Sequence, residues 1–507
     1  MNESKDQHAC INYGLPLFKY GPADTKPSEP WREEKKEALK SLVELCCIYI
    51  TKDSTLTERS INYIPIDLHP RLMHAALTNG RDLVMNILMD NWKEPVLVLH
   101  RFGVINRWMA ISVLAHFHKI IKEQLLNFPD HKSQLRFIDL SGAFLDVTAL
   151  EHLKTLCRVT KKPKTPKPKK GSKRKYTFKI TDKSWQDVKD GGINYGVRLD
   201  YDFGTADMNM RNIWVFGDLM KKCEQDETNF TIQLTRVILT GAVGAIGHLI
   251  VERLHTDYLK GISLRHDRMD DEDFVFLSKF MKCSNLTTLD LSYCGIRFDK
   301  MYKPERDFSV LDNEDLSPIE KLNLLKKPDE RKLVALLNDV LEATPNLVAL
   351  DLGNNTIRGH LKELTHMPRY LELLGLSNCQ LINEDLDFLS QAAYTQNLKV
   401  IDLSTDRRFE GDTVQMYKKI FQVIGENLKQ LVLSCPYLNT TIYSELFSAL
   451  LPLKQLELLN MSGVRLSELE QECLHNKCRQ LPHLKGTSNV LYDAPFMNET
   501  YEDDSQG

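Results

Sequence analysis

The chain has 507 residues, of which 42% are hydrophobic and 27% charged, and its formal net charge is −3 at pH 7. This composition is typical of folded globular proteins. No apolar run reaches the about 18 residues that a membrane span needs, and the polar start MNESKDQHAC lacks an apolar signal core. The 11 cysteines are scattered without a C-x-x-C pair, which favours reduced thiols over a zinc site. We therefore expect no metal, no cofactor and no membrane partner.

A basic, Pro- and Lys-rich linker at residues 158–180 divides the charge of the chain unevenly. Residues 161–175 hold nine of the 66 Lys and Arg residues and no acid, which leaves 57 basic against 69 acidic residues elsewhere, a balance of −12. An acidic body predicts no direct contact with nucleic acid. The linker has the spacing of a bipartite nuclear import signal that importin would bind, formed by Lys161, Lys162, Lys173, Arg174 and Lys175. The alternative is a solvated loop, which would not direct import. With both alternatives open, we expect the protein in both nucleus and cytoplasm.

Two polar tails enclose the rest of the chain. Residues 1–29 are expected to be disordered, and residues 494–507 form an acidic tail. After the first tail, the apolar periodicity of residues 30–130 predicts a helical domain. The expected helices cover residues 30–52, 57–62, 68–78 and 81–91, followed by a further pair over 106–127.

A repeated leucine register organises the second half of the chain. In NLTTLDLSYCGI, residues 285–296, Leu289 and Leu291 are two apart and so point to one face of a strand, while Cys294 stands where the chain turns. The register recurs from Leu347 and Leu371, and looser copies begin at Leu234, Leu259, Leu398, Leu428 and Leu456. Between the first leucines of successive copies the steps are 25, 27, 61, 24, 27, 30 and 28 residues. This is the pattern of a leucine-rich repeat.

The register predicts an α/β fold, a leucine-rich-repeat solenoid or horseshoe that follows the helical N-terminal domain. Each repeat would contribute an inner strand and an outer helix, and no repeat buries its apolar face alone. Residues 131–157 would form the first repeat-like unit or a cap, and residues 190–493 the main array. The long step of 61 holds a charged insertion near residues 298–328.

Two short motifs in the helical domain predict docking of partner proteins. Ser41, Leu42, Cys46 and Ile50 fit the elongin-binding BC box, because a spacing of four keeps the last three on one slowly drifting helix stripe. The alternative is a stripe packed inside its own domain.

Downstream, IPIDLHPRL fits the form of a cullin 2 box at Ile64, Pro65, Leu68 and Leu72. Pro65 can begin a helical turn because its φ is preset. Pro70 lies between the two leucines and is expected to kink or restart the helix, which weakens their shared face. The alternative here is a core helix that a proline initiates.

A glycine-rich stretch opens a different hypothesis. Gly241, Gly244 and Gly247 follow an apolar strand, and Asp267 ends the next one, as in a dinucleotide-binding fingerprint. The repeat register accounts for the same residues, with Asp267 at the turn position.

The LxxLL sequence at 333–337 lies in a repeat helix, so we expect its leucines to be buried. No HExxH, G-x-S-x-G or Walker lysine motif is present in the sequence, so we expect no catalytic site.

The chain resembles the PRAME family, including its leucine-rich-repeat-containing relatives, from about residue 40 to 500. The resemblance lies in LVELCCIYITKD, in IPIDLHPRLMHAALTNGRDLVMNILMDNW, in RFIDLSG before a Lys-rich linker, and in IRGHLKELTHMPRYLELLGLSNCQL. It implies a horseshoe of repeats and a non-catalytic substrate receptor of a cullin 2–elongin B/C ubiquitin ligase, with a link to transcriptional repression. Leu42, Cys46 and Ile50 would then meet elongin C, and Ile64, Pro65, Leu68 and Leu72 would meet cullin 2.

Three hypotheses for function follow. The first is the ligase substrate receptor, which holds a protein substrate on the repeat face. The second is a repeat scaffold or nuclear corepressor that does not dock a ligase. The third is an NAD(P)-binding oxidoreductase built on the glycine-rich stretch.

Overall fold

The computed structural model divides into two compact units, and the division falls between Leu289 and Asp290, within strand β6 (Thr288–Asp290). No helix in the described part of the chain is long and apolar enough to cross a membrane. The structure describes residues 41–102, 106–126, 131–160, 195–205, 215–223, 228–240, 258–265, 285–299, 301–302, 331–405, 411–435, 440–461 and 467–488.

The N-terminal unit begins with helices. Their bounds are α1 (Leu42–Ile50), α2 (Ser54–Ser60), α3 (His69–Thr78), α4 (Asp82–Asp90), α5 (Arg107–Leu126) and α6 (Leu150–Val159), with short 3₁₀ turns η2 (Ile61–Tyr63), η3 (Ile66–Leu68), η4 (Leu99–Arg101) and η5 (Val147–Ala149). The expected helices over 68–78 and 81–91 match α3 and α4. The expected pair over 106–127 is wrong, because α5 is one 20-residue helix. No Gly or Pro interrupts it to force a break.

Strands of the N-terminal unit are parallel and follow one another in sequence order. They are β1 (Val96–Val98), β2 (Phe137–Leu145), β3 (Tyr195–Thr205), β4 (Phe230–Thr240) and β5 (Gly261–Ser263), each paired with the next. β1 lies inside the range where only helices were expected. A dinucleotide-binding sheet reverses its strand order at the binding crevice, and these strands show no such reversal.

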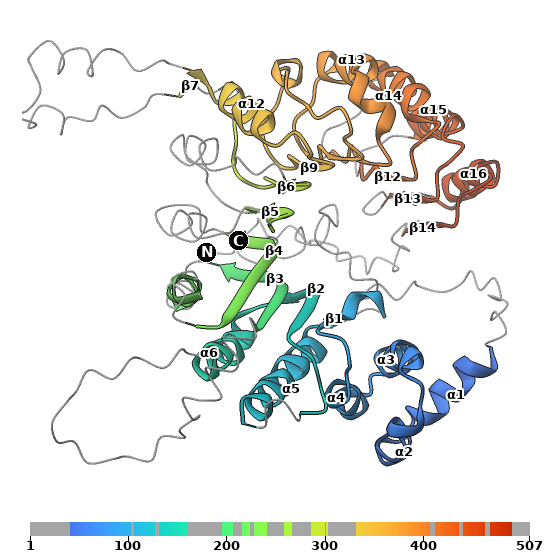
Figure 1. Cartoon of the computed structure of the whole chain (residues 1–507). Helices are drawn as coiled ribbons and strands as arrows, with labels where there is room; N and C mark the ends of the chain where they lie inside the picture. Colours follow the sequence, from blue (N-terminus) through green and yellow to red (C-terminus); the bar gives the residue numbers. More distant parts are fainter. Residues whose placement is uncertain are drawn as a thin grey trace, which may run out of the picture. The chain divides into compact units, whose positions relative to one another are not determined.

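Helices α5 and α6 lie together on one side of these strands (Figure 1). Val113, Leu114 and Phe117 of α5 are fully buried, and Ile138 and Leu140 of β2 are fully buried as well. Because Ile138 and Leu140 alternate with the polar residues Asp139 and Ser141 along β2, one strand face packs on the helices and the other carries polar groups.

The C-terminal unit contains the regular repeats. Its strands after β6 are β9 (Ala349–Asp351), β10 (Leu373–Gly375), β11 (Val400–Asp402), β12 (Gln430–Val432), β13 (Leu458–Asn460) and β14 (Gly486–Ser488). Its helices are α12 (Leu333–Ala343), α13 (Asn383–Gln391), α14 (Gly411–Ile424), α15 (Thr440–Ala449) and α16 (Glu468–Cys478), with 3₁₀ turns η8 (Leu361–Glu363) and η9 (Ala393–Asn397). Strands β9 to β14 pair in parallel in sequence order, and α13 to α16 form a row on one side of them (Figure 1).

This arrangement confirms the predicted fold class. In the registers from Leu259 onward, the second leucine, or the isoleucine in its place, is the middle residue of a strand and is completely buried, as at Leu350, Leu374 and Ile401. In the register from Leu234 this position is Val237, which is completely buried within β4. Sequence register and strand register therefore coincide.

The turn position of the repeats forms a hydrogen-bonded ladder. Asn355 Nδ2 donates to the carbonyl oxygens of Leu291 and Leu352, both at 2.8 Å, and its Oδ1 accepts from the Ile296 amide at 2.9 Å. In the next repeat, Cys379 Sγ takes the place of the amide and lies 3.0 Å from the Leu352 carbonyl. A small polar side chain here satisfies backbone groups that turn away from the sheet.

Two short strands pair antiparallel near the ends of the expected insertion. β7 (Met301–Tyr302) lies within it, and β8 (Arg331–Lys332) lies just after it. Phe298, where the insertion was expected to begin, is fully buried, so it belongs to the preceding repeat. Most of the remaining insertion lies outside the described residues.

Candidate docking and recognition surfaces

Helix α1 has a defined start. Ser41 Oγ accepts from the Glu44 amide at 3.3 Å, and Glu44 Oε2 accepts from the Ser41 amide at 2.7 Å, which completes a reciprocal capping box. The hydrogen bond from the Ser41 backbone lowers the pKa of Glu44. The serine of the BC-box pattern therefore caps the helix. The part of the expected helix before Ser41 lies outside the described residues.

One face of α1 is apolar and exposed. Leu42 is 76% exposed, Leu45 50% and Tyr49 69%, and Cys46 is exposed between them. These four residues, the apolar stripe of α1, stand at i, i+3, i+4 and i+7, which aligns them along one side of a helix. On the opposite side Cys47 is buried, where α1 packs on α2 and α3.

The C-terminal end of α1 is fixed to α2. The Thr57 hydroxyl, fully buried, donates to the Ile50 carbonyl at 2.8 Å and to the Asp53 carbonyl at 3.0 Å. Ile50, the last predicted elongin contact, is only half-buried. Each four-residue step turns the helix by about 400°, so the stripe drifts by about 40° per step. Ile50 therefore leans toward the packed side, while Leu42 and Cys46 remain exposed.

The cullin-box-like segment is a loop followed by a helix. Pro65 is exposed and precedes η3, where the Leu68 amide donates to the Pro65 carbonyl at 3.0 Å. Ile64 and Leu68 are half-buried. Tyr63 at 88% and Ile66 at 57% are the most exposed apolar side chains of this loop. The cullin 2 box pattern includes neither Tyr63 nor Ile66. Their signal in the sequence was an apolar side chain close to Pro65 that fits no helical or strand period.

Of the two alternatives for Pro70, a kink or a restart of the helix, the structure shows the restart. Pro70 is the second residue of α3, where its missing amide hydrogen costs no helical hydrogen bond. One expectation about this segment needs correction. Leu72 is completely buried, so in this conformation it packs the N-terminal unit and offers no surface to a partner.

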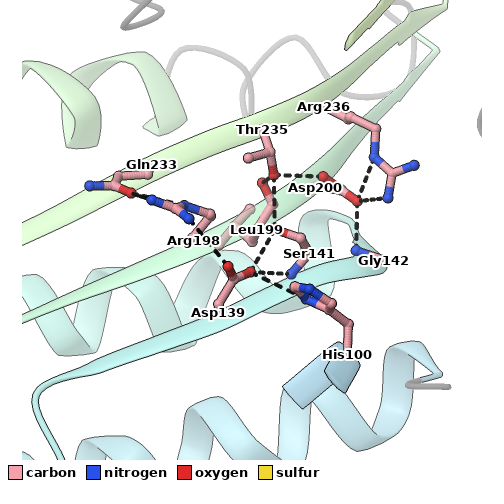
Figure 2. Close-up of polar contacts among 10 residues, drawn as sticks. All are labelled: His100, Asp139, Ser141, Gly142, Arg198, Leu199, Asp200, Gln233, Thr235 and Arg236. Atoms are coloured by element: carbon pink, nitrogen blue, oxygen red, sulfur yellow. Dashed lines mark hydrogen bonds and ion pairs between the residues drawn. The ribbon is translucent and has the colours of Figure 1, made fainter. Parts of the chain in front are cut away.

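The open strand face of the N-terminal unit carries a polar network (Figure 2). Asp139 in β2 is nearly buried. Its Oδ1 accepts from the Ser141 amide at 2.9 Å and hydroxyl at 2.6 Å, and its Oδ2 lies 3.4 Å from Arg198 Nη1. His100 Nδ1 lies 3.9 Å from the same carboxylate. This aspartate thus holds its own turn and the next strand together.

Asp200 in β3 has no exposed surface, yet both of its oxygens are satisfied. Oδ1 accepts from the Thr235 hydroxyl at 2.8 Å. Oδ2 accepts from the Gly142 amide at 2.7 Å and from Arg236 Nε at 2.9 Å and Nη2 at 2.5 Å. The strand register shifts near these residues, and Gly142 has φ of +100° there, a backbone conformation that favours glycine.

The two arginines of the network are also held by neighbours. Arg198 Nε and Nη2 donate to Gln233 Oε1 at 3.0 and 2.8 Å, and its guanidinium lies over the Phe137 ring at 5.7 Å. Arg236 lies over the Phe144 ring at 5.1 Å. Because these charges are paired inside the sheet, this face supports strand register.

The open strand face of the C-terminal unit consists of two parallel rows; the first is mostly half-buried, and the second is buried except for Asn460. The strand register aligns a mainly apolar row, and a second row two residues further along each strand. The first row is Ala349, Leu373, Val400, Gln430 and Leu458; the second is Asp351, Gly375, Asp402, Val432 and Asn460. Just before the strands, Lys399 pairs with Glu372 at 2.5 Å, and Lys429 and Lys485 both pair with Glu457. The apolar row therefore has a charged border.

Several sequence predictions lie beyond what the structure describes. The residues of the expected import signal, Lys161, Lys162, Lys173, Arg174 and Lys175, fall outside the described ranges, and so do Gly241, Gly244, Gly247 and Asp267. Within those ranges no group of three or more His, Cys, Asp or Glu side chains is placed to hold a metal ion. The LxxLL leucines, Leu333, Leu336 and Leu337, are buried in α12 as expected.

Parallel strands in sequence order, leucine registers that coincide with strand centres, and outer helices define a leucine-rich-repeat protein. Over 498 residues the chain is 21% identical to leucine-rich repeat-containing protein 14 of Xenopus laevis. The alignment covers 92% of this chain and 89% of that protein. It is 33% identical over 86 residues to the proteins of that name from Rattus norvegicus and Mus musculus, 17% of each chain. The chain is thus a leucine-rich-repeat protein similar to leucine-rich repeat-containing protein 14, which belongs to the PRAME-family repeat proteins.

No family model matches the sequence. Among solved structures, the leucine-rich repeat-containing protein LegL7 from Legionella pneumophila aligns with 58% of this chain and 82% of its own, at 15% identity and a TM-score of 0.34. The fold assignment depends on the strand register and not on that likeness. Proteins of this repeat class are generally non-catalytic.

Proposed function

We propose that this protein is a substrate-recognition subunit of a cullin 2–elongin B/C ubiquitin ligase. The observation that carries the proposal is the apolar stripe of α1. A short helix with an exposed apolar face is a common form for docking into a partner's hydrophobic groove. Monomeric proteins rarely leave contiguous apolar surface without an interaction that uses it.

The same surface matches the residue types of the BC box. Leu42 would fill a partner pocket, and the small Cys46 would let the partner helix approach closely. Leu45 and Tyr49 extend the contact, and a tyrosine contributes a large area at low cost in side-chain entropy. Ile50 would contribute at the edge of the contact, since it is half-buried.

Cullin 2 would contact the loop before α3. Tyr63, Pro65 and Ile66 supply its exposed surface, with Ile64 and Leu68 half-buried beneath them. Leu72 supports this loop from the core. The substrate would bind the open strand face of the repeats and be ubiquitylated by proximity, so the receptor requires no catalytic side chain.

Recovery of elongins B and C with the tagged full chain tests this proposal. We expect Leu42→Ala combined with Cys46→Phe to abolish recovery, because the pocket contact is lost and a bulky ring blocks helix approach. Leu83→Ala is the matched control, since Leu83 on α4 is 68% exposed and outside the stripe. Equal recovery with all three proteins would refute docking through α1.

A repeat scaffold or nuclear corepressor without ligase docking is the second candidate function. The mainly apolar row of the C-terminal unit would serve a protein partner in either case. A wild-type chain that captures other proteins through its strands but recovers no elongin would establish this candidate instead.

A further inference from the structure

Two cysteines from different helices of the N-terminal unit place their sulfurs side by side. Cys157 belongs to the last turn of α6, and Cys223 ends the helix at residues 215–223. Their Sγ atoms are 3.6 Å apart, although 66 positions separate the two residues in the sequence. A disulfide holds its sulfurs at about 2.05 Å. A small side-chain rotation therefore brings these thiols to bonding distance.

Packing on both sides holds the two thiols in this place. On the second helix, Phe216 is buried, and its ring centre lies 4.5 Å from that of Tyr201 and 5.1 Å from that of Phe203, both in β3. Just after α6, the Thr160 carbonyl accepts from the Asn229 amide at 2.9 Å, directly before β4. The close approach of the sulfurs therefore follows from helices that are anchored on neighbouring strands.

The pair has a different setting from the buried cysteines of the repeats. Cys379 Sγ lies 3.0 Å from the Leu352 carbonyl, and Cys294 Sγ lies 3.6 Å from the Ser292 carbonyl, so both hold the turn of a repeat. Cys157 lies within a helix, and its sulfur faces another sulfur. The turn position of the repeats therefore does not explain this pair.

The two thiols differ in their access to solvent. Cys157 is 4% exposed, whereas Cys223 is half-buried. The hydrogen bond with Cys223, together with burial, raises the pKa of Cys157, so Cys157 keeps its proton at neutral pH. A dissolved oxidant consequently meets Cys223 first, and Cys157 stands within reach as the second thiol.

We propose that Cys157 and Cys223 form a reversible oxidation site, a disulfide that hydrogen peroxide generates and a thiol reductant breaks. In the first step the Cys223 sulfur attacks one peroxide oxygen and the O–O bond breaks, which gives a sulfenic acid and water. In the second step the Cys157 sulfur attacks the Cys223 sulfur and the S–O bond breaks. The hydroxyl leaves with the Cys157 proton as a second water, so two thiols are oxidised and one peroxide is reduced.

Reduction reverses the change by thiol–disulfide exchange. One reductant thiol attacks the disulfide and forms a mixed disulfide, and a second reductant thiol releases the protein thiol. While it lasts, the bond joins α6 to the helix at 215–223 and closes a loop of 66 residues. Such a cross-link stabilises mainly by restricting the unfolded chain, and the effect grows with loop length. The inference does not depend on the proposed ligase role, because neither α1 nor the repeat strands take part.

Mass spectrometry of the full chain after treatment with hydrogen peroxide tests the site. A digest kept free of reductant should contain a peptide pair linked through Cys157 and Cys223, and dithiothreitol should release it. Oxidation should raise the melting temperature of the N-terminal unit by roughly 10 °C. Cys223→Ser should lose both the link and this rise. Cys473→Ser is the matched control, since Cys473 on α16 is also half-buried, and it should retain both.

Two results would overturn the assignment. One is the absence of a linked pair in the oxidised wild type, and the other is a link from Cys223 to a different cysteine. A rise in melting temperature that Cys223→Ser also shows would likewise count against the site, because the stabilisation would then come from another change.

A second variant tests the order of the two thiols. In Cys157→Ala the sulfenic acid on Cys223 has no thiol to attack it, so dimedone, a reagent that marks sulfenic acids, should label Cys223 in this variant and not in the wild type. Equal labelling in both proteins would show that Cys157 does not respond, which would contradict the proposal. Because Cys157 is buried, the melting transition of the variant is checked first. Cys223→Ser, at a half-buried position, decides on the link independently.

Discussion

Leu72→Ala and Leu42→Ala should have opposite consequences, although both positions fall within predicted docking motifs. Leu72 has no exposed surface, whereas Leu42 is 76% exposed. Truncating a fully buried leucine removes its transfer free energy and leaves a cavity, at a cost of about 2–5 kcal/mol. Truncating an exposed leucine normally changes stability by less than about 0.5 kcal/mol.

The measurement must report on the helices themselves, because a chain of two units need not unfold in one step. Hydrogen exchange of peptides from α3, residues 69–78, is suited to this. Leu72→Ala should accelerate exchange in α3 and its neighbour α4 by on the order of 30-fold or more if exchange follows local opening, since about 2 kcal/mol corresponds to that factor. Leu42→Ala should leave the protection of α3 unchanged.

Elongin capture completes the comparison. Leu42→Ala should reduce capture while the helices stay protected, because an exposed anchor contributes to binding and little to folding. The reasoning would be refuted if Leu42→Ala deprotected α3 as strongly as Leu72→Ala does. It would also be refuted if Leu72→Ala lost cullin binding with α3 protection intact, since Leu72 would then be a direct contact.

Three further predictions address the repeats and the linker. Asn355→Ala should lower stability by roughly 3 kcal/mol in urea unfolding, because it leaves buried backbone groups unpaired; an unchanged midpoint would show that the ladder is dispensable. Burial raises the pKa of Asp402 to about 6, above about 3.9 in the unfolded chain, so the folded state binds the extra proton between those values. Stability should therefore fall by about 3 kcal/mol as pH rises from about 4 to 6. Tyr417 and Cys435, which face Asp402, have raised pKa values and stay neutral in that range, so Asp402→Asn should remove this slope; a slope that survives would assign it to other groups. Alanine at residues 173–175 should shift the protein toward the cytoplasm, and an identical distribution by imaging would show that the linker is only a solvated loop.

The repeat strands could be predicted because one residue type marks each of them. In every register from Leu259 onward, a leucine or isoleucine at the centre of the strand is buried, and its spacing of two from the next apolar residue fixes the face. The turn residues followed from the same register, since Asn355 and Cys379 are small enough to enter the turn and polar enough to bond there.

Other features depend on contacts between distant parts of the chain, which a local pattern does not show. The strand at Val96–Val98 is three residues long and exists because it pairs with β2. The exposure of Tyr63 and the burial of Leu72 depend on how α3 packs, because both positions are apolar and only the tertiary structure separates surface from core. The bonds between Asp200 and Arg236 likewise require two strands 36 residues apart in sequence to meet.

The row positions of the C-terminal unit also constrain the backbone of a partner that crosses the strands. Adjacent strands lie about 4.8 Å apart, so alternate strands are about 9.6 Å apart. A polyproline II segment rises about 9.3 Å in one turn of three residues. Every third side chain of such a segment would therefore meet alternate strands in step, first Ala349, then Val400 and then Leu458, whose register the pairing of β9 to β13 fixes. A fully extended β-segment, which repeats its side chains about every 6.6 Å, would fall out of step after one strand.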